Sequence, residues 1–174
     1  MSYEPYPGGG YQPFPGGPDG GLPQRLEPPP SVLNAVRLMY VGAILSGVAA
    51  VIGLTAVGSV RTTLRDQTNP ALSASQVNLA VNFFIGGVVV VGLIGIGLWL
   101  WMAVKNKAGR NWARITSTVF FALSTLLLLG SIARPGTAPS RIVNILGWVI
   151  GLGTVILLWQ RQSSDYFKGQ AAPW

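Results

Sequence analysis

The segment Val77–Val104, VNLAVNFFIGGVVVVGLIGIGLWLWMAV, contains no charged side chain. Its Val, Ile and Gly content would suit a strand, but strands seldom exceed about 10 residues. A helix of about 20 apolar residues crosses the roughly 30 Å hydrocarbon core of a bilayer. In hydrocarbon each backbone polar group has to bond within its own segment, and a helix achieves this. The segment therefore predicts a transmembrane helix whose apolar centre begins at Val81.

Three further apolar runs have the same character, and Arg or Lys residues bound them. Each reaches the roughly 18–20 residues that a membrane-spanning helix needs. The expected spans are about 38–60, 81–104, 115–132 and 142–159. The sequence therefore predicts an all-α, polytopic membrane protein in which four transmembrane helices form a small bundle.

The composition agrees with a chain that faces lipid over much of its surface. Hydrophobic residues make up 49% and charged residues 10% of its 174 residues, whereas soluble domains carry about 25% charged residues. The net charge of +7 comes from short basic groups between the apolar runs, which indicates loops beside anionic headgroups and not a nucleic-acid surface. The chain has no Cys and no His, which excludes disulfides and most zinc or haem ligation.

The chain divides into three expected parts. Residues 1–30 alternate aromatic residues with Pro and Gly without a helical or strand period, which predicts a disordered tail. Residues 31–168 form the expected four-helix membrane domain, and residues 169–174 form a short C-terminal tail.

Helix boundaries have local signals. Ser31 follows three prolines and is expected to cap the first helix. Ser73 and Gln76 have the spacing of a capping box just before the second apolar run. The Arg-Pro-Gly sequence at 134–136 is expected to end the third helix, because Pro and Gly both disfavour its continuation.

Charge distribution predicts the orientation of the chain. Four spans place both termini on one side of the membrane. The basic residues on that side are Arg25, Arg37, Lys105, Lys107, Arg110, Arg114, Arg161 and Lys168, and those on the other side are Arg61, Arg65, Arg134 and Arg141. By the positive-inside rule the richer side is cytoplasmic. We therefore expect a plasma (inner) membrane protein with cytoplasmic N- and C-termini.

Small side chains let helices approach closely in a membrane, where lipid gives no hydrophobic drive for association. The expected packing residues are Gly42, Ser46 and Gly53 in the first span and Gly147 and Gly151 in the fourth. Ser117, Ser124 and Ser131 mark one face of the third span, and these faces are expected to meet inside the bundle. The Gly-x-x-x-Gly pair could instead support a homodimer; packing within one chain is the simpler interpretation.

The sequence offers little catalytic chemistry. No charged residue lies in the central part of a span, which argues against a proton-coupled transporter or pump. The five carboxylates are Glu4, Asp19, Glu27, Asp66 and Asp165. On the expected topology Asp66 lies across the membrane from the others and cannot pair with them as acid and base. Without His or an intramembrane Lys, no Ser has an evident activating base, so we expect no enzymatic activity, cofactor or metal site.

Two features leave functional alternatives open. Asn78 and Asn82 lie one turn apart in the second span, where they line a polar vestibule or bond to neighbouring backbone. The alternative function is a small transport or channel component acting as an oligomer, in which Asn82 and Asn144 would affect flux.

The densest polar feature is the basic loop 105–114, which holds Lys105, Lys107, Arg110 and Arg114. Each basic residue near a membrane contributes about 1 kcal/mol to the attraction for anionic lipid. The loop is therefore a candidate site for anionic headgroups or an acidic partner, although a topology signal alone would also explain it.

Three motifs resemble those of a group of small four-helix membrane proteins of actinobacteria. They are Pro29–Tyr40 (PPSVLNAVRLMY), Asn106–Arg114 (NKAGRNWAR) and Ser164–Phe167 (SDYF). The resemblance covers roughly residues 28–168. It implies four spans, an inner-membrane location and a variable cytoplasmic tail, and it implies no activity.

These observations together favour a multi-pass plasma-membrane protein with a non-enzymatic interaction or structural role. It would act through the basic cytoplasmic loop and the tail. The expected partners are the anionic headgroups of the bilayer and either another membrane protein or a second copy of the chain.

Overall fold

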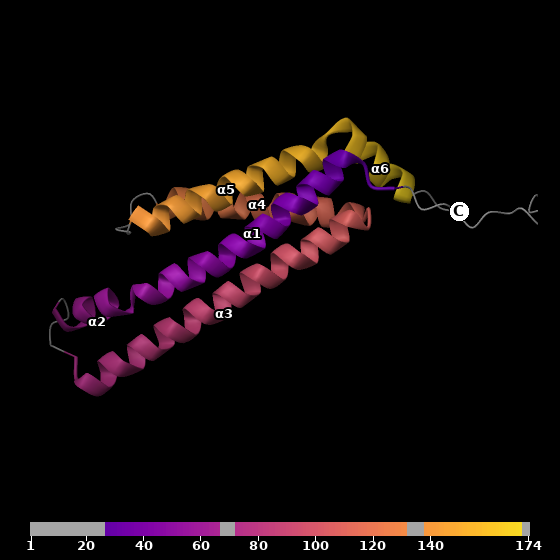
Figure 1. Ribbon diagram of the computed structural model, residues 1–174. Coiled ribbons are helices and arrows are strands. Elements are labelled where there is room, and N and C mark those ends of the chain that lie inside the picture. Colours follow the sequence, from indigo (N-terminus) through magenta and orange to yellow (C-terminus); the bar gives the residue numbers. More distant parts are fainter. Residues whose placement is uncertain (1–26, 67–71, 132–137, 172–174) are drawn as a thin grey trace, which may run out of the picture.

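The computed structural model describes residues 27–66, 72–131 and 138–171, and all secondary structure in these ranges is helical (Figure 1). The helices are α1 Pro30–Thr55, α2 Val57–Asp66, α3 Ala74–Lys107, α4 Asn111–Ser131, α5 Ala138–Trp159 and α6 Arg161–Ala171. Of these, α1, α3, α4 and α5 are long and apolar enough to cross a membrane. The prediction of an all-α protein with four transmembrane helices is confirmed. The expected disordered tail lies almost entirely outside the described residues.

Helix α1 is the centre of the arrangement. It packs against α3 on one side and α5 on the other, and α4 packs against α5. Although α3 and α4 are consecutive, they make few contacts with each other. Figure 1 shows α3 leaning away from α5 toward the end of the molecule that holds α2. The described chain begins and finishes at the opposite end, beside α6; these ends are named the α2 end and the α6 end.

Large apolar side chains cover the outside of the spanning helices. Ile44 is 69% exposed, Phe83 74%, Val91 69% and Leu127 68%. A soluble protein rarely exposes a continuous apolar surface of this extent, whereas such a surface is stable in hydrocarbon. The outer faces of the four long helices therefore mark a membrane protein.

The first long helix ends at Thr55, earlier than the expected 38–60 span, because the chain bends at Ala56. Two hydroxyls bond to nearby carbonyls here: Thr55 Oγ1 donates to the Ile52 carbonyl at 2.7 Å, and Ser59 Oγ donates to the Ala56 carbonyl at 2.8 Å. Such side-chain bonds compete with the regular helical pattern and bend helices. The chain then continues as the short, more polar helix α2.

Close approach of α1 and α3 depends on glycines in both helices. A Cβ atom added at Gly42 would lie 2.7 Å from Cε2 of Trp99, and one added at Gly92 would lie 2.8 Å from Cβ of Ala50. Both distances are shorter than carbon atoms tolerate in contact. Glycine is therefore required at these two positions if the helices are to keep their separation.

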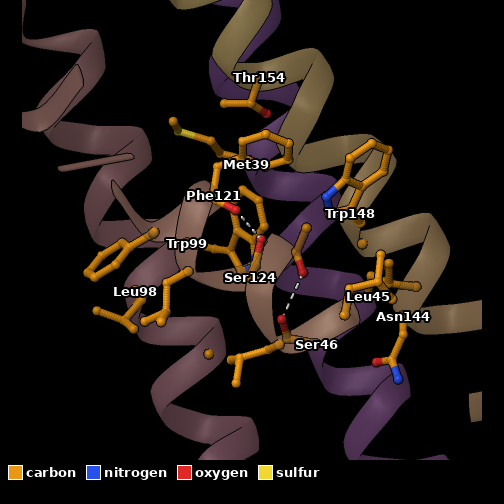
Figure 2. Close-up of a pocket in the computed structure, with 18 of the residues that line it drawn as sticks. Met39, Leu45, Ser46, Leu98, Trp99, Phe121, Ser124, Asn144, Trp148 and Thr154 are labelled. Carbon is orange, nitrogen blue, oxygen red and sulfur yellow. Dashed lines mark hydrogen bonds between the residues drawn. The ribbon is translucent and has the colours of Figure 1, made fainter. Parts of the chain in front are cut away.

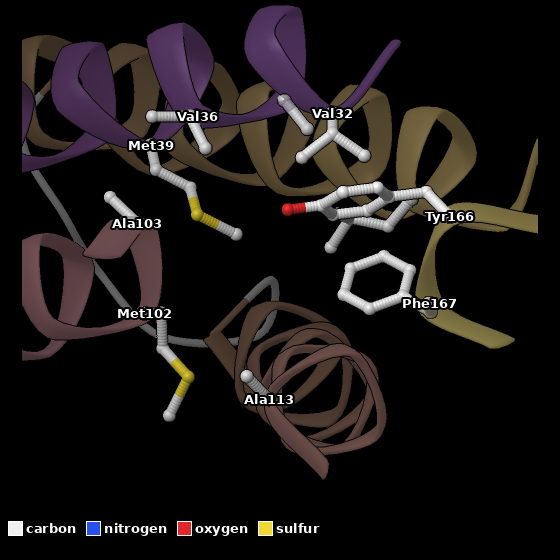
Figure 3. Close-up of a cluster of buried hydrophobic side chains, with 10 residues drawn as sticks. Val32, Val36, Met39, Met102, Ala103, Ala113, Tyr166 and Phe167 are labelled. Atoms are coloured by element: carbon white, nitrogen blue, oxygen red, sulfur yellow. The ribbon is translucent and has the colours of Figure 1, made fainter. Parts of the chain in front are cut away.

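The buried hydrophobic core lies at the α6 end, where five helices meet (Figure 3). Its members are Val32, Ala35, Val36, Met39, Met102, Ala103, Ala113, Leu158, Tyr166 and Phe167. Figure 3 shows Tyr166 and Phe167 of α6 reaching toward side chains of α1, α3 and α4. Helix α6 therefore acts as a cover over the converging ends of the four spans.

The helix-boundary predictions had mixed outcomes. The capping box is confirmed, because Ser73 Oγ accepts from the Gln76 backbone N–H and Gln76 Oε1 accepts from the Ser73 backbone N–H. The prediction that Ser31 caps α1 is wrong, because α1 begins at Pro30 and its Pro29 cap makes no side-chain bond. Helix α4 ends at Ser131, and the 134–136 sequence lies outside the described residues.

We predict that Gly42→Ala destabilises the protein, because the new methyl group would overlap the Trp99 ring. Overpacking of this kind costs about 1–3 kcal/mol. The measurement is the midpoint of thermal unfolding in a mild detergent. Gly86→Ala in α3 is the control, because a Cβ there meets no atom within 4 Å. Equal melting midpoints for the two variants would contradict the α1–α3 contact.

Candidate functional site

The basic residues predicted as a loop belong mainly to two helix ends. Lys105 and Lys107 lie in the last turn of α3, Arg110 lies in the connection, and Arg114 lies in the first turn of α4. Lys107 and Arg110 are exposed, and Lys105 and Arg114 are half-buried. The four residues, called the basic cluster, are therefore held by regular structure at the α6 end.

The turn between α3 and α4 depends on Gly109, which adopts a φ of 69°. The Gly109 N–H bonds to the Asn106 carbonyl at 3.0 Å, and the Arg110 N–H bonds to the Lys105 carbonyl at 3.3 Å. This pair of bonds is the Schellman motif that ends many helices at a glycine. It fixes the direction in which Arg110 leaves α3.

Arg114 differs from the other basic residues because its guanidinium group packs within the chain. Its Cζ lies 4.2 Å from the ring centroid of Trp159 and 5.2 Å from that of Phe167. Its Nη1 donates to Ser164 Oγ at 3.1 Å. Cations attract the faces of aromatic rings, most strongly that of Trp. Arg114 therefore ties α4 to the end of α5 and to α6.

Helix α6 was not predicted, and its Ser163 and Tyr166 side chains bond to the rest of the α6 end. Ser163 Oγ donates to the Leu157 carbonyl at 2.7 Å and lies 2.8 Å from Ser31 Oγ. Tyr166 OH donates to the Lys107 carbonyl at 2.9 Å. The sequence signal was the placement of Ser163, Tyr166, Phe167 and Gln170 on one helical face. The Tyr166 bond braces the segment that carries the basic cluster, and the Ser163 bonds fix α6 to α5 and α1.

Asn106 joins α3 to α4 beneath the basic cluster. Its side chain is completely buried, and Nδ2 donates to the Met102 carbonyl at 2.9 Å and to Ser117 Oγ at 3.1 Å. Within the described part of the chain, its Oδ1 and the Nε of Arg114 are buried without a hydrogen-bond partner. Buried unpaired polar atoms cost about 1–3 kcal/mol each. At this end Asn106 Oδ1 can accept one further bond, and Arg114 Nε can donate one.

A cavity of about 560 Å³ lies between the helices, toward the middle of the membrane domain (Figure 2). Residues of α1, α3, α4 and α5 line it. The small and polar ones are Gly42, Ser46, Ala49, Gly95, Ser117, Ser124, Ser131, Asn144, Gly147, Gly151 and Thr154. The described residues that line the cavity include no Asp, Glu, Lys or Arg. This cavity is called the groove, because α3 and α4 do not close over it.

The hydroxyl groups of the groove are largely occupied by their own helices. Ser46 Oγ donates to the Gly42 carbonyl at 3.0 Å, Ser124 Oγ to the Phe121 carbonyl at 2.8 Å, and Thr154 Oγ1 to the Ile150 carbonyl at 2.8 Å. Figure 2 shows the first two of these bonds. Because their hydrogens are engaged, the groove presents a mainly apolar surface.

The five predicted packing residues lie at helix contacts, and four of them also line the groove. Gly53 faces Val88 of α3, and Gly151 faces Phe121 of α4, with 3.0 Å from an added Cβ to the nearest carbon in each case. Gly42 and Ser46 line the groove from α1, and Gly147 and Gly151 line it from α5. Asn78 and Asn82 are not among the lining residues, whereas Asn144 is.

No protein-family model, no curated protein and no solved structure matches this chain. The chain has two candidate functional features, which are the braced basic cluster at the α6 end and the groove that begins beneath it.

We predict that Phe167→Ala releases α6 from the bundle. Phe167 is 1% exposed, and truncation of a buried Phe costs about 3–5 kcal/mol. The measurement is the rate of tryptic cleavage at Arg161 and Lys168 in detergent, which should rise. Gln162→Ala, at an exposed position of the same helix, should leave the rate unchanged. Equal cleavage rates in the two variants would show that the core contact does not hold α6.

Proposed function

We propose that this chain is a plasma-membrane protein with a non-enzymatic interaction or structural role, and that its basic cluster is the contact surface. The observation that carries the proposal is the bracing of that cluster. Its residues sit on a glycine-ended helix, a tight turn and a helix start, which α6 ties together through Tyr166 and Arg114. A basic segment that served only as a topology signal would not need to be held in place by bonds to α6.

The exposed members of the cluster are best placed to contact a partner. Lys107 and Arg110 are exposed and Lys105 is half-buried. Arg114 adds positive charge on the side of the cluster that faces α5 and α6, where its guanidinium packs on the rings of Trp159 and Phe167. Cations arranged in this way attract anionic headgroups or an acidic protein surface, and the attraction falls off within about a Debye length of the membrane.

Charge distribution supports placing the α6 end in the cytoplasm. The four basic-cluster residues and Arg37, Arg161 and Lys168 all belong to this end, whereas α2 at the other end carries Arg61 and Arg65. Positively charged loops remain preferentially on the cytoplasmic side. Both ends of the described chain would then be cytoplasmic, together with the N-terminal tail.

The character of the groove favours an interaction role over solute transport. Ion and proton pathways in membranes use ionisable side chains or exposed backbone carbonyls. The described residues of the groove supply neither an ionisable side chain nor a continuous polar surface. The same lack of ionisable groups supports a role without catalysis.

We predict that an impermeant thiol reagent added outside intact cells labels cysteines at positions 71 and 138 and not at positions 2, 108 and 172. The native chain has no Cys, so each single substitution gives an unambiguous signal. Permeabilised cells provide the control, because all five positions should then react. Labelling of position 108 in intact cells would invert the proposed orientation.

We predict that a photoreactive amino acid at Ala108 captures a reproducible partner in intact cells. Ala108 is exposed between Lys107 and Arg110. Replacing Lys105, Lys107 and Arg110 by Gln should reduce the yield of the adduct, since the electrostatic attraction is lost.

The matched control replaces Arg61, Arg65 and Arg141 by Gln, which removes the same number of charges from elsewhere in the chain. This control should keep the adduct. Cysteine labelling of both triple variants verifies that neither has changed orientation. Failure of the parent chain to give any reproducible adduct would refute the proposed interaction role.

A further inference from the structure

The groove opens onto lipid and not onto water. Its walls include Leu98 and Trp99 of α3 and Phe120, Leu123 and Leu127 of α4, and Leu123 and Leu127 are 52% and 68% exposed. The described contacts between α3 and α4 lie at the α6 end, where Trp101 and Trp112 have ring centroids 5.6 Å apart. Hydrocarbon offers no water to fill such a space, and an empty one loses dispersion contacts along its walls.

The length of the groove suits an extended apolar chain. Its lining on α4 runs from Ser117 to Ser131, which is about 21 Å at 1.5 Å per residue. The volume of the groove is about 560 Å³. An extended methylene chain, ~4 Å thick at carbon contact distance, fits within a space of this length and volume.

Positive charge marks one end of the groove. On α3 the lining of the groove reaches Met102, and Lys105 lies about one turn further along the helix. Arg110 lies in the turn that joins the two helices forming the open side. Trp101 and Trp112 sit beside this end, and Trp is enriched where headgroups meet the hydrocarbon.

We propose that the groove binds one acyl chain of an anionic phospholipid of the inner leaflet, with the phosphate of its headgroup beside Lys105 and Arg110. The assignment to the inner leaflet rests on the proposed orientation of the α6 end. The acyl chain lies along the face formed by Trp99, Phe120 and Ser124, and its methyl end points toward the α2 end. The positive charge at this end selects an anionic headgroup over a zwitterionic one.

The test uses the full chain in lipid nanodiscs that contain equal amounts of phosphatidylglycerol and phosphatidylcholine with the same acyl chains. Native mass spectrometry after release into detergent counts the lipids that remain bound. The parent chain should retain one phosphatidylglycerol. Ser124→Phe, which fills the groove, should lose it, whereas Ala122→Phe, on the same helix but not lining the groove, should keep it.

Two further variants separate the parts of the proposal. Leu127→Trp fills the groove at another position and should also lose the lipid, which guards against misfolding of one variant. Lys105→Gln combined with Arg110→Gln should keep a bound lipid but reduce the preference for phosphatidylglycerol, by up to about thirtyfold.

Each contrary result has a defined meaning. No retained lipid in the parent chain, or equal retention in Ser124→Phe and Ala122→Phe, would overturn the chain-binding site. An unchanged preference in the double Gln variant would overturn the headgroup assignment. If the parent chain gives no Ala108 adduct but retains the lipid, the partner surface is refuted and the lipid site stands. The proposed function and the lipid site therefore fail by different results.

Discussion

The need to satisfy backbone polar groups without water governs this structure. In hydrocarbon an unpaired N–H or C=O costs several kcal/mol, so each of the four spans is a continuous helix. The same constraint shapes the side chains within the spans. Ser46, Ser124, Thr125 and Thr154 all donate to a carbonyl of their own helix. Trp148 Nε1 donates to Thr125 Oγ1 at 2.9 Å and so joins α5 to α4, while close packing at glycines holds α1 against α3.

Polar contacts between elements gather instead at the α6 end. Ser31 meets Ser163, Tyr166 reaches the Lys107 carbonyl, and Arg114 reaches Ser164. The buried core lies at the same end, whereas the spans separate toward the α2 end. The molecule therefore has its main hydrophobic core at one end, whereas Val77 and Val81 of α3 are buried at the other. Both candidate functional features follow from the arrangement of the helices, because the α6 end presents the basic cluster and the divergence of α3 from α4 leaves the groove.

Hydropathy was enough to predict the four spans, because an uncharged apolar run as long as Val77–Val104 is too long for a strand and long enough to cross a membrane as a helix. The capping box at Ser73 was also visible, since its residues are local. Helix α6 was missed because only Tyr166 and Phe167 among its residues are large and apolar. The role of Ser31 was missed because its partner is 132 residues away. The groove could not be predicted, since it depends on the angle between α3 and α4 and not on any residue pattern.

The central position of α1 has a consequence for biogenesis. Helix α1 precedes its two main neighbours, α3 and α5, which come from different parts of the chain. Its glycine face therefore stays without its α3 neighbour until α3 has been inserted, and its other side stays without its α5 neighbour until α5 has been inserted. The contacts of α1 can therefore form in two steps, first with α3 and then with α5.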